Sequence, residues 1–185
     1  MSNTIKSKLD IFEYEKINEE LEYRYLLGIK GNNPLYCIGM NPSTALPNKF
    51  DQTVLKIFGL ALIHGYDSCV MMNLLPIMET NSSKITNEDN QKYLQKNINH
   101  IIEIVDNDIL ACWGDKISQN SNMKDSFFSI YNKLKDKNIY WFCIDNEKEN
   151  SLLTKQGNPR HPSRINYFKE LKKFNIHKYY NNIKN

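Results

Sequence analysis

The sequence lacks any long hydrophobic run, and no apolar segment approaches the roughly 20 residues that a membrane-spanning helix needs. Residues 1–10 are polar and contain no apolar core segment, so we expect no signal peptide. Cysteine is scarce, and Cys37, Cys69, Cys112 and Cys143 form no C-x-x-C pair. Each stands alone in a short apolar run, which argues against a metal or iron–sulfur site. We therefore expect buried free thiols in a cytoplasmic protein, because the cytoplasm is reducing.

Several catalytic signatures are also missing. The chain has no G-x-S-x-G nucleophile elbow, no G-x-x-x-x-G-K-[ST] phosphate loop and no G-x-G-x-x-G dinucleotide turn. It also shows no pair of close carboxylates of the kind that ordinary glycoside hydrolysis uses. These absences argue against the enzyme classes that depend on those motifs. We expect neither a cofactor nor a bound metal.

The composition is that of a folded domain. Hydrophobic residues make up 41% and aromatic residues 11% of the 185 residues, which excludes a disordered chain. A chain of this length has room for one domain, so we assign 1–185 to a single domain with an N-terminal segment at 1–19 and a frayed tail at 179–185. The net charge of +3 permits a nucleic-acid partner without demanding one. We expect a monomer.

Four short apolar runs organise the chain, and each contains one cysteine. They lie at 35–38, 69–72, 109–112 and 140–144. Because they do not alternate between apolar and polar residues, they are typical of strands buried on both faces of a parallel sheet.

Helical patterns occur between and after these runs, and one further strand precedes them. The helices are predicted at 51–64, with Asp51 as the cap, and at 87–105, 126–134 and 165–174, and the extra strand at 20–29. This alternation predicts a three-layer α/β sandwich around a mostly parallel sheet of about four to five strands.

The residues that follow the four strands are the candidate site. Ligands of open α/β sheets bind beyond the carboxyl ends of the strands. The loops that begin at Gly39, Asn73 and Trp113, and the longer stretch after the fourth strand that ends in 157–164, are therefore expected to converge on one cleft. Their polar content is mainly amides, hydroxyls and one His, with few acids. Amides present both donors and acceptors, so this content suits recognition of a neutral heterocycle and stabilisation of an anionic leaving group.

Four stretches of these loops resemble motifs of the uracil-DNA glycosylase superfamily. Gly39-Met40-Asn41-Pro42 is similar to its first motif, in the form found in the single-strand-selective branch, and His161-Pro162-Ser163 is similar to its second. Asn73 matches the strand-end Asn that reads the pyrimidine edge, and Trp113-Gly114 resembles the Trp-Gly that ends the intervening strand. The resemblance implies a uracil-DNA glycosylase-like fold.

A second resemblance covers nearly the whole chain and is to the family called domain of unknown function 1643. The matching pieces are Arg24-Tyr25, Met40-Asn41-Pro42-Ser43-Thr44-Ala45, Asp51-x-Thr53, Gly65-Tyr66, Asn73-Leu74, Trp113-Gly114 and Gly157-x-Pro159-Arg160-His161-Pro162. This family implies a topology more than an activity.

The glycosylase resemblance implies hydrolysis of the bond between a base and deoxyribose, in DNA repair or anti-phage defence. Asn41 and His161 are the implied catalytic residues. Asn41 can only hold the attacking water, because an amide does not take up protons near neutral pH. His161, with nearby backbone amides, stabilises the departing base.

The implied binding residues surround these two. Gly39, Met40, Phe50 and Asn73 bind the substrate, with Phe50 stacking on the flipped base and Asn73 reading its edge. Ser43, Ser163, Arg160 and Arg164 bind DNA, the serines through flanking phosphates and Arg164 as part of the wedge that fills the vacated stack.

Two departures from the family pattern bear on the substrate and the rate. Strict uracil enzymes have a Tyr where this chain has Ser43, so the pocket is expected to admit 5-substituted pyrimidines as well as uracil. Asn41 stands where faster enzymes have an Asp, which predicts slow turnover.

Two other functions remain open from the sequence. One is a module that binds nucleic acid or a nucleotide without cutting it. The other is a nucleoside hydrolase or deoxyribosyltransferase, for which Asp51 and Asp115 are the available carboxylates. Each site residue also has a structural alternative: Asn41 and Asn73 can close turns, Asp51 can cap a helix and Phe50 can pack in the core.

Overall fold

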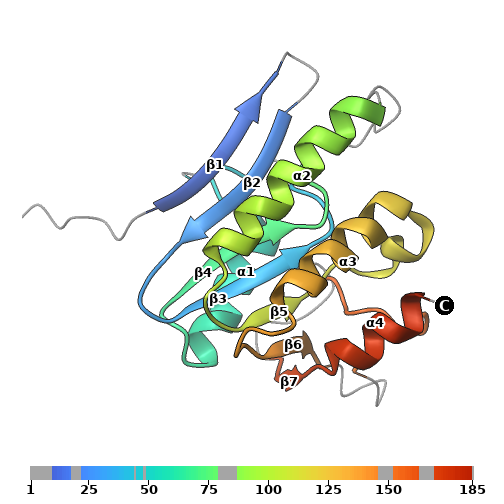
Figure 1. Cartoon of the computed structure of the whole chain (residues 1–185). Coiled ribbons are helices and arrows are strands. Elements are labelled where there is room, and N and C mark those ends of the chain that lie inside the picture. Colours follow the sequence, from blue (N-terminus) through green and yellow to red (C-terminus); the bar gives the residue numbers. More distant parts are fainter. Residues whose placement is uncertain are drawn as a thin grey trace, which may run out of the picture.

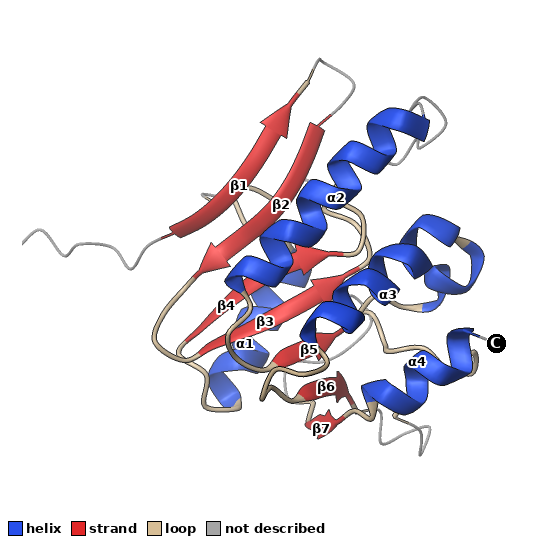
Figure 2. Ribbon diagram, in the orientation of Figure 1, coloured by secondary structure: helices blue, strands red, loops and turns tan. Residues whose placement is uncertain are grey.

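The computed structural model describes residues 10–17, 22–43, 45–47, 49–78, 87–145, 152–162 and 169–184. These residues form one mixed sheet with helices on both faces (Figures 1 and 2). The elements in chain order are β1 (Asp10–Lys16), β2 (Glu22–Ile29), β3 (Pro34–Gly39), α1 (Gln52–Ile63), β4 (Ser68–Asn73), α2 (Asn87–Ile104), β5 (Ile109–Ala111), η2 (Asp115–Gln119), α3 (Ser121–Leu134), β6 (Trp141–Ile144), β7 (Leu171–Lys173) and α4 (Ile176–Lys184).

The sheet has seven strands in the order β1-β2-β4-β3-β5-β6-β7 within the described residues. The four central strands, β4, β3, β5 and β6, are parallel, whereas β1, β2 and β7 pair antiparallel at the two edges. The prediction of a mostly parallel sheet of four to five strands is therefore wrong for the sheet as a whole. The parallel strands were predicted because they are uniformly apolar, and the edge strands are less so.

The four predicted buried strands are confirmed, and they separate two hydrophobic clusters. Side chains of β3 alternate between them: Tyr36 and Ile38 face the cluster under α2 and α3, and Leu35 and Cys37 face the cluster under α1. Figure 1 shows α1 on the opposite face of the sheet from α2 and α3. All four cysteines are buried free thiols, as expected from their apolar surroundings.

Three of the predicted helices are confirmed. In α1, the Asp51 side chain accepts a hydrogen bond from the Val54 backbone N–H at 2.8 Å, as an N-cap does. The second, α2, has the predicted extent, Asn87–Ile104. The third, α3, begins earlier than predicted, at Ser121, because Asn120 caps it by accepting from Met123 N.

The two ends of the chain differ from the predictions. Asp10–Lys16, within the predicted N-terminal segment, is strand β1 and pairs with β2. Residues 171–173, predicted as part of a helix at 165–174, form β7 along β6, and 163–168 lie outside the described residues. The predicted frayed tail is wrong for its described part, because α4 spans Ile176–Lys184 and Tyr179 is buried. No helix within the described ranges combines the length and apolar character required to cross a bilayer.

Two buried tyrosines predict a loss of stability at alkaline pH. Tyr25 Oη donates to Glu15 at 3.0 Å, and Tyr36 Oη donates to Asp106 at 2.6 Å. Burial first, and then these carboxylates, raise the pKa of both phenols well above its usual value. At a pH above the ordinary tyrosine pKa of about 10, the folded state keeps these phenol protons and the unfolded state releases them. This contribution to stability is therefore present below about pH 10 and is lost as the pH rises further.

We expect the free energy of unfolding, measured in urea, to fall as the pH rises from about 10 to about 11, and Tyr36→Phe to flatten this dependence. Tyr140→Phe is the matched control, because Tyr140 is 54% exposed. An equal slope in the wild type and both variants would contradict the assignment.

Candidate active site at the carboxyl ends of the central strands

The carboxyl ends of β4, β3 and β5 lie side by side at one edge of the sheet (Figure 2). Backbone hydrogen bonds continue past the strands and hold the following loops together. Leu74 N donates to Gly39 O and Leu75 N donates to Met40 O, each at 3.0 Å. Cys112 N donates to Ile38 O at 2.9 Å. Three of the four loops predicted to converge, those after β4, β3 and β5, therefore adjoin at this edge, and their convergence with the fourth on one cleft stays a prediction.

Asn73 packs against the loop that contains Asn41. With its amide oriented to satisfy its neighbours, Asn73 Nδ2 donates to Met72 O and to Asn41 O, each at 3.2 Å. A Cβ added at Gly39 would lie only 2.8 Å from the Asn73 amide, so the close approach requires glycine. Asn73 is 2% exposed, and its amide holds the Asn41 loop in place.

Asn41 is only partly buried, and its side chain makes fewer hydrogen bonds than that of Asn73. Its side-chain Nδ2 donates to Pro42 O at 3.3 Å. Among the described residues, no donor reaches Asn41 Oδ1. This carbonyl oxygen is available to accept a hydrogen bond from a water molecule or a ligand.

Arg24 of β2 supports the same loop, and the sequence reasoning did not identify it as a site residue. It is 2% exposed, and its Nη1 donates to Ala45 O at 2.7 Å and to Ser43 O at 3.2 Å. Burial lowers the pKa of Arg24 to about 10, and the Asp51 carboxylate acts in the opposite direction. The sequence signal that could have identified Arg24 is its position as a charged residue inside the apolar run of β2, because a buried charge needs specific partners.

His161 lies on the other side of the β3 end, beside the loop that follows β5. Gly114 N donates to Pro159 O at 2.9 Å. A Cβ added at Gly114 would lie 3.5 Å from the His161 Cβ, and Gly114 has φ +73°, so a side chain is disfavoured there. Asn41 thus follows β3, whereas His161 lies in the segment after β6, which contacts the loop after β5, the strand between β3 and β6.

The remaining predicted binding residues also make structural contacts. Ser43 Oγ accepts from Ala45 N at 3.3 Å, Met40 packs on the larger core cluster, and the Phe50 ring stacks on Phe58 with centroids 5.3 Å apart. All three are partly exposed, so each retains surface for a ligand.

Arg160 and Asp115 shape the loop that leads to His161. Arg160 Nη2 donates to Leu153 O at 2.6 Å. The Asp115 carboxylate accepts from Thr154 Oγ1 at 2.5 Å and from Asn158 Nδ2 at 3.0 Å. Ser163 and Arg164, predicted to bind DNA, lie outside the described residues. Within the described part of the chain, no three His, Cys, Asp or Glu side chains gather as a metal site would require.

The Asp51 contact makes a testable distinction between a cap and a nucleophile. Asp51→Ala is expected to lower the free energy of unfolding by about 1 kcal/mol, because the Val54 N–H loses its acceptor. Asp51→Asn keeps an acceptor and is expected to retain both stability and activity. Urea denaturation and turnover of the two variants measure this. An Asn variant that folds normally but loses all turnover would instead identify a catalytic carboxylate.

Comparison with known proteins gives one family and no individual relative. A family model described as "Protein of unknown function (DUF1643)" matches residues 24–163. Neither the curated proteins nor the solved structures include a match to the chain. Arg24, Asn41, Asn73 and His161 all fall within the matched span.

Proposed function

The chain belongs to the DUF1643 family, and we propose that it hydrolyses the N-glycosidic bond of uracil or a 5-substituted base flipped out of DNA. The observation that carries the proposal is that the loop after β3 and the segment after β6 lie on the two sides of β5 in the sheet. One presents the accessible amide oxygen of Asn41, and the other carries His161 beside Gly114. The first motif of the glycosylase resemblance thus follows β3, and His161 of the second lies against the loop after β5, the next strand in the sheet.

The chemistry assigned to these residues is hydrolysis without a covalent intermediate. Asn41 Oδ1 accepts a hydrogen bond from the attacking water and aims it at C1′ of the sugar. The amide takes no proton, so the rate depends on stabilising the departing base. His161 and neighbouring backbone N–H groups supply that stabilisation by donating to the base oxygen as negative charge develops.

The neighbours of Asn41 support its assigned role as a water-holding residue. Asn73 fixes the Asn41 carbonyl, and Arg24 fixes the carbonyls of Ser43 and Ala45. A loop held at three points keeps a catalytic group within a narrow range of positions, which orientation-dependent catalysis requires. The small Ser43 leaves space for a substituent at C5 of the base.

The test is base release from oligonucleotides that carry a single modified base. Single- and double-stranded forms would contain uracil, 5-hydroxymethyluracil, 5-hydroxymethylcytosine, its glucosylated form or hypoxanthine, and alkali cleavage would reveal abasic sites. Release by the wild type, absent in Asn41→Ala/His161→Ala, is the expected result. No release from any substrate would overturn the proposal.

A non-catalytic nucleic-acid-binding module is the second candidate function. The observation that favours it over base excision is the burial of Asn73. Its amide already donates to backbone carbonyls, so it is not free to read the edge of a flipped base. In that case the wild type and Asn41→Ala/His161→Ala would both bind DNA in a salt-sensitive manner, and neither would release a base.

A further inference from the structure

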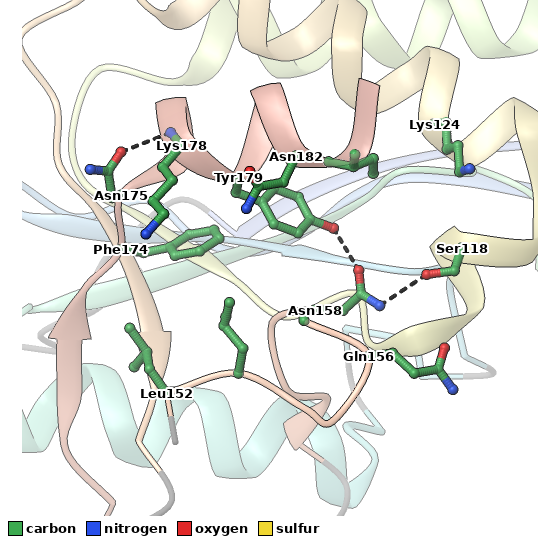
Figure 3. Close-up of a pocket in the computed structure, with 13 residues that line it drawn as sticks. Ser118, Lys124, Leu152, Gln156, Asn158, Phe174, Asn175, Lys178, Tyr179 and Asn182 are labelled. Atoms are coloured by element: carbon green, nitrogen blue, oxygen red, sulfur yellow. Dashed lines mark hydrogen bonds between the residues drawn. The ribbon is translucent and has the colours of Figure 1, made fainter. Parts of the chain in front are cut away.

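A pocket lies apart from the loops of Asn41 and Asn73, between α4, the 152–158 segment and the start of α3 (Figure 3). Its volume is about 840 Å³. This volume falls within the roughly 300–1,000 Å³ typical of small-molecule and cofactor sites. Leu152 and Phe174 contribute apolar surface, and Gln156, Asn175 and Asn182 contribute amides. The lining therefore offers both an apolar surface for a flat ring and donors and acceptors for its edge.

One wall of this pocket is held rigidly by buried hydrogen bonds. Trp113 Nε1 donates to Tyr179 Oη at 3.0 Å, and Tyr179 Oη donates to Asn158 Oδ1 at 2.8 Å. Asn158 Nδ2 donates to Ser118 Oγ at 3.0 Å. Because Ser118 Oγ accepts in this chain of bonds, its own O–H can donate into the pocket. A wall fixed in this way loses little entropy when a ligand binds.

The charge of the lining is positive. Lys178 of α4 and Lys124 of α3 lie at opposite ends of the pocket (Figure 3). No Asp or Glu lines the described pocket, and neither lysine forms an ion pair with a described carboxylate. Two unpaired ammonium groups that flank an amide-rich surface favour an anionic ligand with a planar polar ring.

We propose that this pocket binds one nucleotide of a single strand of nucleic acid. The phosphates on the 5′ and 3′ sides of that nucleotide contact the two lysines. The base lies against Leu152 and the part of Phe174 that stays exposed, and the amides contact its edge. A nucleotide within a strand has a phosphate on each side, which matches two cations at opposite ends better than a single phosphate does. The proposal does not rest on base excision, and its readout is binding alone.

The test is fluorescence anisotropy with a short labelled oligothymidylate at several salt concentrations. Lys124→Ala/Lys178→Ala is expected to weaken binding at least about tenfold and to reduce the slope of log K against log salt by about 1.4, or about 0.7 for each lost phosphate contact. Thymidine 5′-monophosphate, thymidine and inorganic phosphate compete in parallel, and we expect the monophosphate to compete weakly and the other two not at all.

The matched control is Lys133→Ala/Lys184→Ala, which removes the same charge from the same two helices but outside the pocket. It is expected to bind like the wild type. Equal weakening in both double variants would overturn the proposal, since it would reflect general surface charge. No binding of oligothymidylate by the folded wild type would overturn it as well. Lys124→Gln/Lys178→Gln and thermal melting of every variant separate lost binding from lost folding.

Discussion

His161→Ala is expected to reduce the rate of base release about 10²- to 10³-fold, the loss typical when one donor to a developing negative charge is removed. His161 lies beside Gly114, and the Gly114 N–H bond to Pro159 O holds the segment just before it in place. The substitution should affect the maximal rate more than the substrate concentration at half-maximal rate, because the interaction forms mainly in the transition state. Single-turnover assays on the active oligonucleotide measure the rate.

His100→Ala is the matched control for this variant. His100 packs on the Tyr25 ring from α2, and its side chain is not part of the loops at the carboxyl ends of the strands. It should release base at the wild-type rate. Equal losses in the two variants would point to a general effect of histidine removal on folding and would contradict the catalytic assignment.

Asn41 gives a companion test within the same prediction. Asn41→Ala is expected to lower the rate about 10²-fold, because the water loses its positioning acceptor. Asn41→Asp is expected to be faster than the wild type, because a carboxylate can take the proton of the water, an effect worth about 10²- to 10⁴-fold in general base catalysis. An Asp variant as slow as the Ala variant would show that Asn41 does not hold the water.

Trp113→Ala is expected to produce the largest loss of stability, about 3–5 kcal/mol in the free energy of unfolding. Trp113 is 1% exposed and contacts the rings of Phe127, Trp141 and Tyr179 in the larger core cluster. Its removal leaves a cavity and also deprives Tyr179 Oη of a donor. Urea denaturation followed by circular dichroism measures the change.

Trp113→Phe separates packing from hydrogen bonding. It keeps an aromatic ring but loses the Nε1 donor, so the expected loss is smaller, about 1–2 kcal/mol. Because Tyr179 and Asn158 belong to the wall of the pocket beside α4, this variant should also weaken oligothymidylate binding if the proposed site is correct. A Phe variant as unstable as the Ala variant would mean that the hydrogen bond, not the packing, dominates.

The sequence alone predicted the elements whose signals are local. The four central strands are uniformly apolar, and the helix after Asp51 carries both an amphipathic pattern and its own cap. The strand-end positions of Asn41, Asn73 and Trp113 followed from the parallel sheet, because all carboxyl ends of parallel strands meet at one edge.

Strands β1 and β7 and helix α4 could not be predicted in this way. In β7 the lysines at 172 and 173 fit the exposed face of a helix equally well, and only pairing with β6 makes the segment a strand. The α4 residues have the composition of a polar tail. They are ordered as a helix through contacts such as the hydrogen bond between Tyr179 and Trp113, which is 66 residues away in the chain. Arg24 likewise acquires its role only by contact with Ala45, 21 residues later.

For this protein, the sequence by itself determined the central strands, three of the helices and the loops that carry the candidate residues. Hydrophobic periodicity and capping determined them, and both act between residues close in the chain. Only the tertiary structure decided the antiparallel edges, the support of the Asn41 loop by Arg24 and the pocket beside α4. Those features depend on hydrogen bonds and burial between residues far apart in the chain, which exist only when the sheet and its helices have assembled.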